Sequence, residues 1–240
     1  MAGSDQGRTF GGFSPQLIEF LEGLSANNNK AWFEHHRDDY EALFKEPARQ
    51  FVTAISGQLG KLAPDLKAEP KIGRSIHRIN RDTRFSKDKT PYRPLLHFVF
   101  WRGAKPNASP AFHFVIGPRY VGVGAGMWAL MPGQLEAYRD AVANQMKAAA
   151  LAAAIENATK IKGIVLDPPA LKRLPAGYEA NHPHNDLLRY KGIVVRGEGP
   201  IPKTLFGAGA IDLALDRLRP FVAVHDWLVT HLASGSFTPE

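Results

Sequence analysis

Residues 78–92 carry the side chains of this chain that are best suited to binding chemistry. The segment reads Arg-Ile-Asn-Arg-Asp-Thr-Arg-Phe-Ser-Lys-Asp-Lys-Thr-Pro-Tyr. Arginine presents a planar fork that matches carboxylate or phosphate, whereas lysine acts as a point charge. We therefore expect a binding site for a small ligand that bears a phosphate or carboxylate group. The expected ligand-binding residues are Arg78, Arg81, Asp82, Arg84, Lys89 and Tyr92.

Each kind of side chain in this segment has an expected role. The arginines and Lys89 would hold the anion, Asp82 would orient the arginines, and Tyr92 would donate a hydrogen bond. If the site is catalytic, Asp82 or Asp88 could act as the base and Tyr92 or His113 as the acid. The sequence identifies neither a reaction nor a cofactor.

Two other functions fit the same segment. Nucleic-acid binding is the first alternative, although only Phe85 and Tyr92 offer rings for stacking and the interleaved acids would repel a phosphate backbone. A structural or interaction role is the second, because Asp82 and Asp88 lie among basic residues and can pair with them inside a loop.

The net charge of the chain is concentrated in one place. The 240 residues include 30 lysines and arginines against 23 acids, a formal charge of +7. Residues 71–93 hold eight of the basic residues and two of the acids, so nearly all of the excess belongs to this segment. A local anion site explains that distribution better than a generally basic surface.

The segment resembles the signature of a bacterial and fungal domain-of-unknown-function family, numbered 2461. The signature consists of Arg-x-x-Arg-Asp-x-Arg-Phe, a short spacer and Asp/Asn-Lys-x-x-Tyr. Most of it fits here, with Asp88 before the lysine and these residues in place: Arg78, Arg81, Asp82, Arg84, Phe85, Lys89 and Tyr92. Other parts of the chain are similar to the family as well, namely Asn28-Asn29 with Trp32 or Phe33, Tyr40, the run 122–126, Arg139 and Asp186-Leu187-Leu188. The resemblance implies a family and a site but no reaction.

Several histidines are candidate metal ligands or acid–base groups. His97 and His113 are expected on adjacent strands, with Asp82 as the only nearby third ligand, and hydrogen-bonded histidines on a sheet face are the simpler interpretation. His182 and His184 flank Pro183, where a surface loop is favoured over a metal site. The chain has no cysteine, which excludes thiolate metal centres and disulfides.

Periodicity predicts an α+β fold with an antiparallel meander packed against N-terminal and C-terminal helices. Helices are expected from Ser14, around Trp32 to Phe44, from Pro47, over 132–158 and over 211–232. The expected strands are 74–82, 95–101, 111–117, 119–126, 164–166 and 193–196. Phe85 is expected to anchor the charged loop to the core, and the glycines at 122, 124 and 126 should let another backbone approach.

We expect one domain over residues 10–232, with a flexible N-terminal arm at 1–9 and a C-terminal tail at 233–240. The longest uncharged apolar run, 148–155, falls far short of the roughly 20 residues that a membrane-spanning helix needs. The N-terminal residues lack the apolar stretch of a signal peptide, so the expected location is the cytoplasm. The sequence predicts no oligomeric state.

Overall fold

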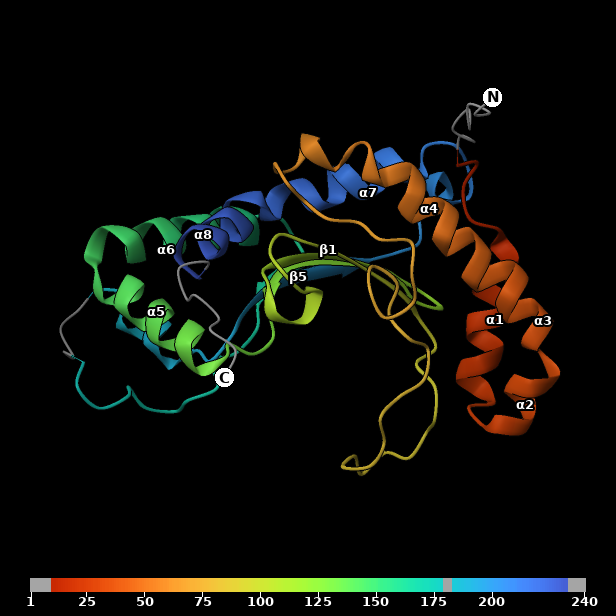
Figure 1. Ribbon diagram of the computed structural model, residues 1–240, viewed down its shortest axis with the longest axis horizontal. Coiled ribbons are helices and arrows are strands. Elements are labelled where there is room, and N and C mark those ends of the chain that lie inside the picture. The colour runs from red at the N-terminus through yellow and green to blue at the C-terminus, as the bar shows by residue number, and fades with distance from the viewer. Residues whose placement is uncertain (1–9, 179–182, 233–240) are drawn as a thin grey trace. The chain divides into compact units, whose positions relative to one another are not determined.

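The computed structural model describes residues 10–178 and 183–232 (Figure 1). The expected arm at 1–9 and tail at 233–240 lie outside these residues. The α-helices are α1 (Pro15–Ala26), α2 (Lys30–His35), α3 (Arg37–Asp39), α4 (Glu46–Ser56), α5 (Pro132–Ala143), α6 (Gln145–Thr159), α7 (Ala210–Leu218) and α8 (Val222–Leu232). The strands are β1 (Leu96–Trp101), β2 (Ala111–Ile116), β3 (Val121–Met127), β4 (Ile164–Leu166) and β5 (Ile193–Gly199).

Short helical turns connect these elements. The π-helical turn is η1 (Tyr40–Lys45), and the 3-10 turns are η2 (Leu59–Lys61), η3 (Pro106–Ala108), η4 (Asn185–Arg189), η5 (Lys203–Phe206) and η6 (Arg219–Phe221). The helix expected from Pro47 is α4, which begins one residue earlier, at Glu46, as a continuation of η1. The wide turn, in which the Glu46 N–H bonds the Glu41 carbonyl, accommodates a proline that would clash with the carbonyl four residues before it in a regular helix.

The five strands form one antiparallel sheet in the order β1-β2-β3-β5-β4. Strands β1, β2 and β3 are consecutive neighbours, which confirms the predicted α+β fold and its meander. β5 follows β3 in the sheet, and β4 pairs antiparallel with β5 through Val165 opposite Arg196. Within β3, a side chain at Gly124 or Gly126 would collide with the backbone of Val195 or Ile193 in β5, so these glycines allow close strand contact as expected.

The chain divides into two compact units, each built from separate stretches of sequence. The first contains the residues up to Val99 together with Phe114–Gly122 and Gly199–Arg217. The second contains Phe100–His113, Val123–Glu198 and the residues from Leu218 onward. The predicted domain bounds of 10–232 stay a prediction.

An aromatic cluster forms the core of the first unit. Phe51 of α4 lies with its ring centroid 4.6 Å from Phe98 of β1 and 5.7 Å from Phe114 of β2, and Phe13 joins them at 5.2 Å from Phe51. All four rings are fully buried. Burial of each phenyl ring contributes about 1.5–3 kcal/mol, so this cluster holds the N-terminal helices on the sheet.

The C-terminal helices cover the strands of the second unit. His225 of α8 stacks on Phe112 of β2 with 4.3 Å between ring centroids. Trp227 lies edge-on to Tyr138 of α5 and donates its indole N–H to the carbonyl of Lys147 at 2.8 Å. α8 thus binds both the sheet and the α5–α6 pair.

The helices expected over 132–158 are α5 and α6, which are divided where Asn144 leaves the helical conformation and caps α6 by accepting a hydrogen bond from Lys147 N at 3.1 Å. One of the expected elements is wrong. The strand expected over 74–82 is reduced to single bridges, Ile76 with Phe98 and Asn80 with Tyr92. Prolines at 91 and 94 in the opposite leg have no N–H to donate, which interrupts the ladder.

Gly126 supplies a direct test of the β3–β5 contact. Its φ is +145°, and a Cβ at this position would overlap the Ile193 carbonyl. Gly126→Ala should therefore lower the free energy of unfolding by at least about 2 kcal/mol, measured by urea denaturation. Gly133→Ala is the matched control, because no atom lies within 4 Å of its Cβ position, and it should be neutral or stabilising by up to about 1 kcal/mol. Equal effects of the two changes would refute this packing.

His225 should make the stability of the protein sensitive to acid. Its side chain is 0% exposed, and burial lowers its pKa, with Asp226 acting in the opposite direction and Arg102 in the same one. The folded state thus favours the neutral ring, so stability should be lost as the pH falls below the ordinary histidine pKa of about 6.5 toward the lowered value. His225→Phe should flatten the dependence of the urea midpoint on pH across this window.

The control for this measurement is His35→Gln, since His35 is exposed on α2. An unchanged pH dependence in His225→Phe would contradict the assignment.

Candidate functional site

The signature segment forms a projecting hairpin, residues 77–93, which we call the basic hairpin. Figure 1 shows it in gold as two extended legs that leave the strands of the first unit and close in a small loop. Arg81 N–H bonds the Pro91 carbonyl at 2.8 Å, and Arg93 N–H bonds the Ile79 carbonyl at 2.7 Å. At the base, the His77 N–H bonds the His97 carbonyl at 2.9 Å, which joins the hairpin to β1.

The α1–α2 turn holds the second leg of the basic hairpin. The amide of Asn28 donates to the Tyr92 carbonyl at 2.9 Å and accepts from the Tyr92 N–H at 3.0 Å, as a neighbouring strand would. The Tyr92 ring stacks on Phe33 at 4.2 Å between centroids and is only 5% exposed. Asn29 caps α2 by accepting from Trp32 N at 3.0 Å. Tyr92 is therefore fixed at the foot of the hairpin, and its role as a donor to a ligand stays a prediction.

The guanidinium of Arg81 is the hub of the loop. Its Nη1 bonds Asp88 and Thr90, and its Nη2 lies 3.4 Å from the hydroxyl of Ser86. Asp88 in turn accepts from the Thr90 N–H at 2.9 Å and from its hydroxyl at 2.8 Å. The Thr90 hydrogen bonds and the Arg81 pair lower the pKa of Asp88 to about 2. A carboxyl with that pKa is a weak base near neutral pH.

A second ion pair lies nearer the tip. The guanidinium of Arg84 donates to both carboxylate oxygens of Asp82, with Nε 3.0 Å from Oδ1 and Nη2 2.7 Å from Oδ2. The backbone N–H of Arg84 also donates to this carboxylate. The Arg84 hydrogen bonds lower the pKa of Asp82. Lys89 donates to the Thr83 carbonyl at 3.0 Å. Both acids of the hairpin are thus ionised and bound to arginine.

The expectation that Phe85 anchors the loop to the core is wrong. Its ring is 95% exposed, and the Arg84 guanidinium lies 5.8 Å from the ring centroid. The polar bonds of Arg81 and Asp88 order the loop in place of an apolar contact. Ser86 and Thr90, which were not among the expected site residues, take part in that network. Their short hydroxyl side chains, close in sequence to Arg81, are the feature that could have predicted this.

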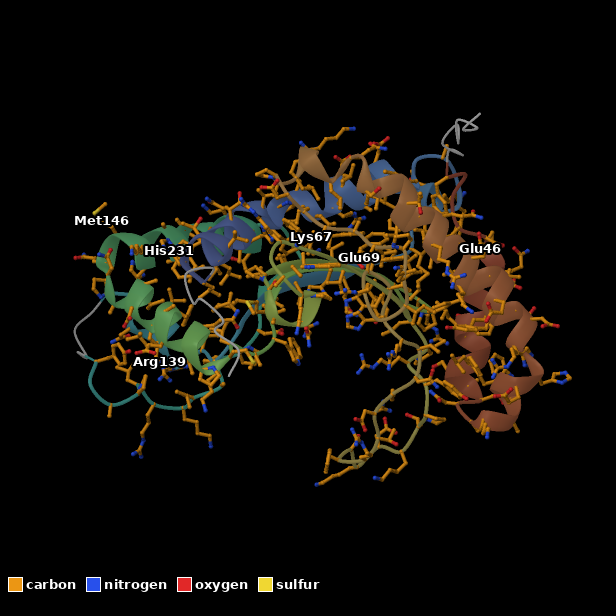
Figure 2. The ribbon with its side chains drawn as sticks, viewed as in Figure 1. Glu46, Lys67, Glu69, Arg139, Met146 and His231 are labelled. Carbon is orange, nitrogen blue, oxygen red and sulfur yellow. The ribbon has the colours of Figure 1, made fainter. Side chains whose placement is uncertain are left out.

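Three basic side chains of the hairpin take no part in these internal ion pairs and hydrogen bonds. The side chains of Arg78, Lys87 and Arg93 are exposed, and none makes a hydrogen bond or ion pair with the residues that the structure describes. On the approach to the hairpin, Arg74 pairs with Glu69 at 3.3 Å, and Figure 2 labels Glu69 together with Lys67.

The histidine candidates are placed as follows. His97 stacks with His77 at 4.2 Å, and burial, with Arg93 adding to it, lowers the pKa of His77. His113 lies half-buried in β2 and belongs to the second unit. His182 lies outside the described residues, and Asp186 lies in the first turn of η4, where it pairs with Arg189. Over 10–178 and 183–232, no three metal-binding side chains gather.

A pocket of about 400 Å³ lies elsewhere in the first unit. It is lined by Glu22, Ser25 and Ala26 at the end of α1 and by Pro118 and Arg119 of the β2–β3 turn. Arg119 Nε is 3.6 Å from a Glu22 carboxylate oxygen. None of the expected site residues lines this pocket.

In the described part of the chain, no helix has the length and apolar character to cross a membrane.

Arg81→Ala should loosen the loop without unfolding the protein. The change removes the guanidinium that bonds Asp88, Ser86 and Thr90, while the Asn28 and Phe33 contacts at the hairpin base remain. Because ion pairs near the surface contribute about 1 kcal/mol or less, the melting temperature should fall by only a few degrees. Amide hydrogen exchange in residues 83–90 should become much faster.

Arg93→Ala is the control, because that side chain is exposed and has no described partner. Global unfolding of Arg81→Ala, or unchanged exchange in the loop, would contradict the hub role.

The comparisons with known proteins place the chain in a family. The family described as "Conserved hypothetical protein (DUF2461)" matches residues 16–227. The match begins in α1, ends within α8 and includes the whole of the basic hairpin. No curated protein matches the chain. A match over most of the chain confirms the family that the Arg78–Tyr92 signature indicated: the chain belongs to the DUF2461 family.

Proposed function

We propose that this protein binds single-stranded nucleic acid through the tip of the basic hairpin. The observation that carries the proposal is Phe85, which is 95% exposed on a loop held in shape by its own ion pairs. An aromatic ring offered to solvent on an ordered support can stack on an unpaired base. Every base has a flat face, so such a contact tolerates different sequences.

The exposed cations of the basic hairpin suit a phosphate backbone. Lys87 is two residues from Phe85, and Arg84 lies beside the ring with its side chain 77% exposed. Arg78 and Arg93 are exposed at the foot of the two legs, and like Lys87 their side chains make no hydrogen bond or ion pair with a described residue. Guanidinium and ammonium groups next to a stacked base can contact the flanking phosphates. We expect the affinity to fall steeply with salt, because binding would release counterions from the phosphates.

The two acids of the segment, Asp82 and Asp88, disfavour nucleic-acid binding less than the sequence alone suggests. Asp82 is bound by Arg84 and Asp88 by Arg81, so each negative charge is compensated within the loop. Their repulsion toward a phosphate backbone is reduced accordingly. The ion pairs inside the loop, which would also suit a purely structural role, would then serve binding as well. They hold the tip of the hairpin in the shape that exposes Phe85.

A small anionic ligand held by Arg78, Arg81, Arg84, Lys89 and Tyr92 is the other candidate. The fork of Arg81 already has acceptors in Asp88 and Thr90, and Tyr92 is stacked on Phe33. The exposed ring and open tip therefore favour an extended ligand over an enclosed small one. A cytoplasmic location, where single-stranded RNA is abundant, is part of the proposal.

Phe85→Ala should weaken binding to single-stranded oligonucleotides. Stacking of one base is worth about 1–3 kcal/mol, so the Kd should rise about 5- to 100-fold, as measured by fluorescence anisotropy at low salt. Phe85→Tyr keeps an aromatic face and should retain most of the affinity. Lys87→Ala should lower the affinity for all sequences and reduce the salt slope by about one.

Three results would overturn the proposal. The first is the absence of any anisotropy change with DNA or RNA strands at low salt. The second is Phe85→Ala binding as tightly as the unmodified protein. Equal affinity for duplex and single strand would also refute it, because stacking on a free base requires an unpaired strand.

A further inference from the structure

Two arginines of the second unit have buried N–H groups without acceptors. The Nε atoms of Arg139 on α5 and of Arg189 in η4 are both inaccessible to solvent, and neither has a hydrogen-bond partner among the residues that the structure describes. A buried donor left without an acceptor costs about 1–3 kcal/mol, and such groups are rare in folded proteins. Arg196 in the same unit differs, because its Nε donates to Asp167 at 2.7 Å.

The fold brings these two arginines to neighbouring elements. Figure 2 labels Arg139 on α5, and α5 packs against η4. The hydroxyl of Tyr138 donates to the Leu187 carbonyl at 2.8 Å, which ties the residue before Arg139 to the residue two before Arg189. Tyr138 is 0% exposed and Leu187 is 8% exposed, so this connection is part of the core.

The charge balance of the pair is positive. Arg139 has no ion-pair or hydrogen-bond partner among the described residues. Arg189 uses Nη1 to bind Asp186 at 3.2 Å, and the Asp186 side chain is 81% exposed and able to turn away into solvent. Among the described residues, the one carboxylate paired with either guanidinium is thus that of Asp186, and both Nε donors lack acceptors there.

We propose that Arg139 and Arg189 form an oxyanion-binding site that takes the phosphate group of a small ligand. The edge of guanidinium that carries Nε and one Nη binds two oxygens of the same anion side by side. Phosphate has enough oxygens to accept from both arginines, and its charge would compensate the excess on this pair. This site is separate from the function proposed for the basic hairpin.

The test follows the arginine Nε–H signals by NMR in protein labelled with 15N-arginine. Inorganic phosphate is titrated at constant ionic strength, and the signals of Arg139 and Arg189 should shift together with one Kd. Arg139→Lys and Arg189→Lys assign the two signals, and each change should weaken phosphate binding at least about tenfold, because lysine keeps the charge but has no fork. Arg173→Lys, an exposed position in the same unit, should bind phosphate normally.

Asp186→Asn separates a binding role from a structural one. Removing the carboxylate that competes for Arg189 should tighten phosphate binding several-fold, a gain that a damaged fold would not produce. A parallel titration with acetate gives the class of anion: preference for phosphate supports the proposal, and preference for acetate overturns the assignment to phosphate. Phe85→Ala should leave these shifts unchanged, which keeps this test independent of the hairpin.

The site is refuted if phosphate shifts neither Nε signal. It is also refuted if only one of the two arginines responds, or if both lysine variants bind phosphate as tightly as the unmodified protein.

Discussion

The guanidinium of Arg81 determines the form of the basic hairpin. It joins Asp88, Ser86 and Thr90 in a loop that has no apolar side chain in the core. Because the planar fork directs its donors at fixed angles, three partners within ten residues of Arg81 define a loop shape. The exposure of Phe85 at the tip of the hairpin follows from that shape.

The foot of the hairpin is held by a different kind of interaction. Asn28 replaces the missing strand by bonding both backbone groups of Tyr92, and the Tyr92 ring packs on Phe33. The α1–α2 turn thereby positions the polar loop, because the loop has no apolar side chain of its own in the core. Such a division, with a rigid base and a charged end, is typical of binding loops carried on a scaffold.

The two proposed sites use arginine in opposite ways. Arg81 and Arg84 in the hairpin are bound to carboxylates of their own loop, and they shape the surface that a ligand would meet. Arg139 and Arg189 keep buried Nε donors that the described protein leaves without acceptors. The first arrangement orders a chain segment, and the second leaves binding capacity for an anion.

The fold class and the meander could be predicted from the sequence, because alternation and helical spacing reflect which face of each element is buried. The concentration of charge in residues 71–93 can be counted directly. The sequence also located the Arg78–Tyr92 signature, and with it the family. Only the tertiary structure shows that Phe85 points into solvent. An aromatic residue in a charged loop is expected to pack in the core, but here polar bonds order the loop without it. The tertiary structure also decided that 74–82 is not a strand, because the prolines that interrupt the ladder lie in the opposite leg. The unpartnered Nε groups of Arg139 and Arg189 cannot be predicted from the sequence either. Whether a donor has an acceptor depends on contacts between residues far apart in the chain, such as Tyr138 and Leu187, which are about 50 positions apart.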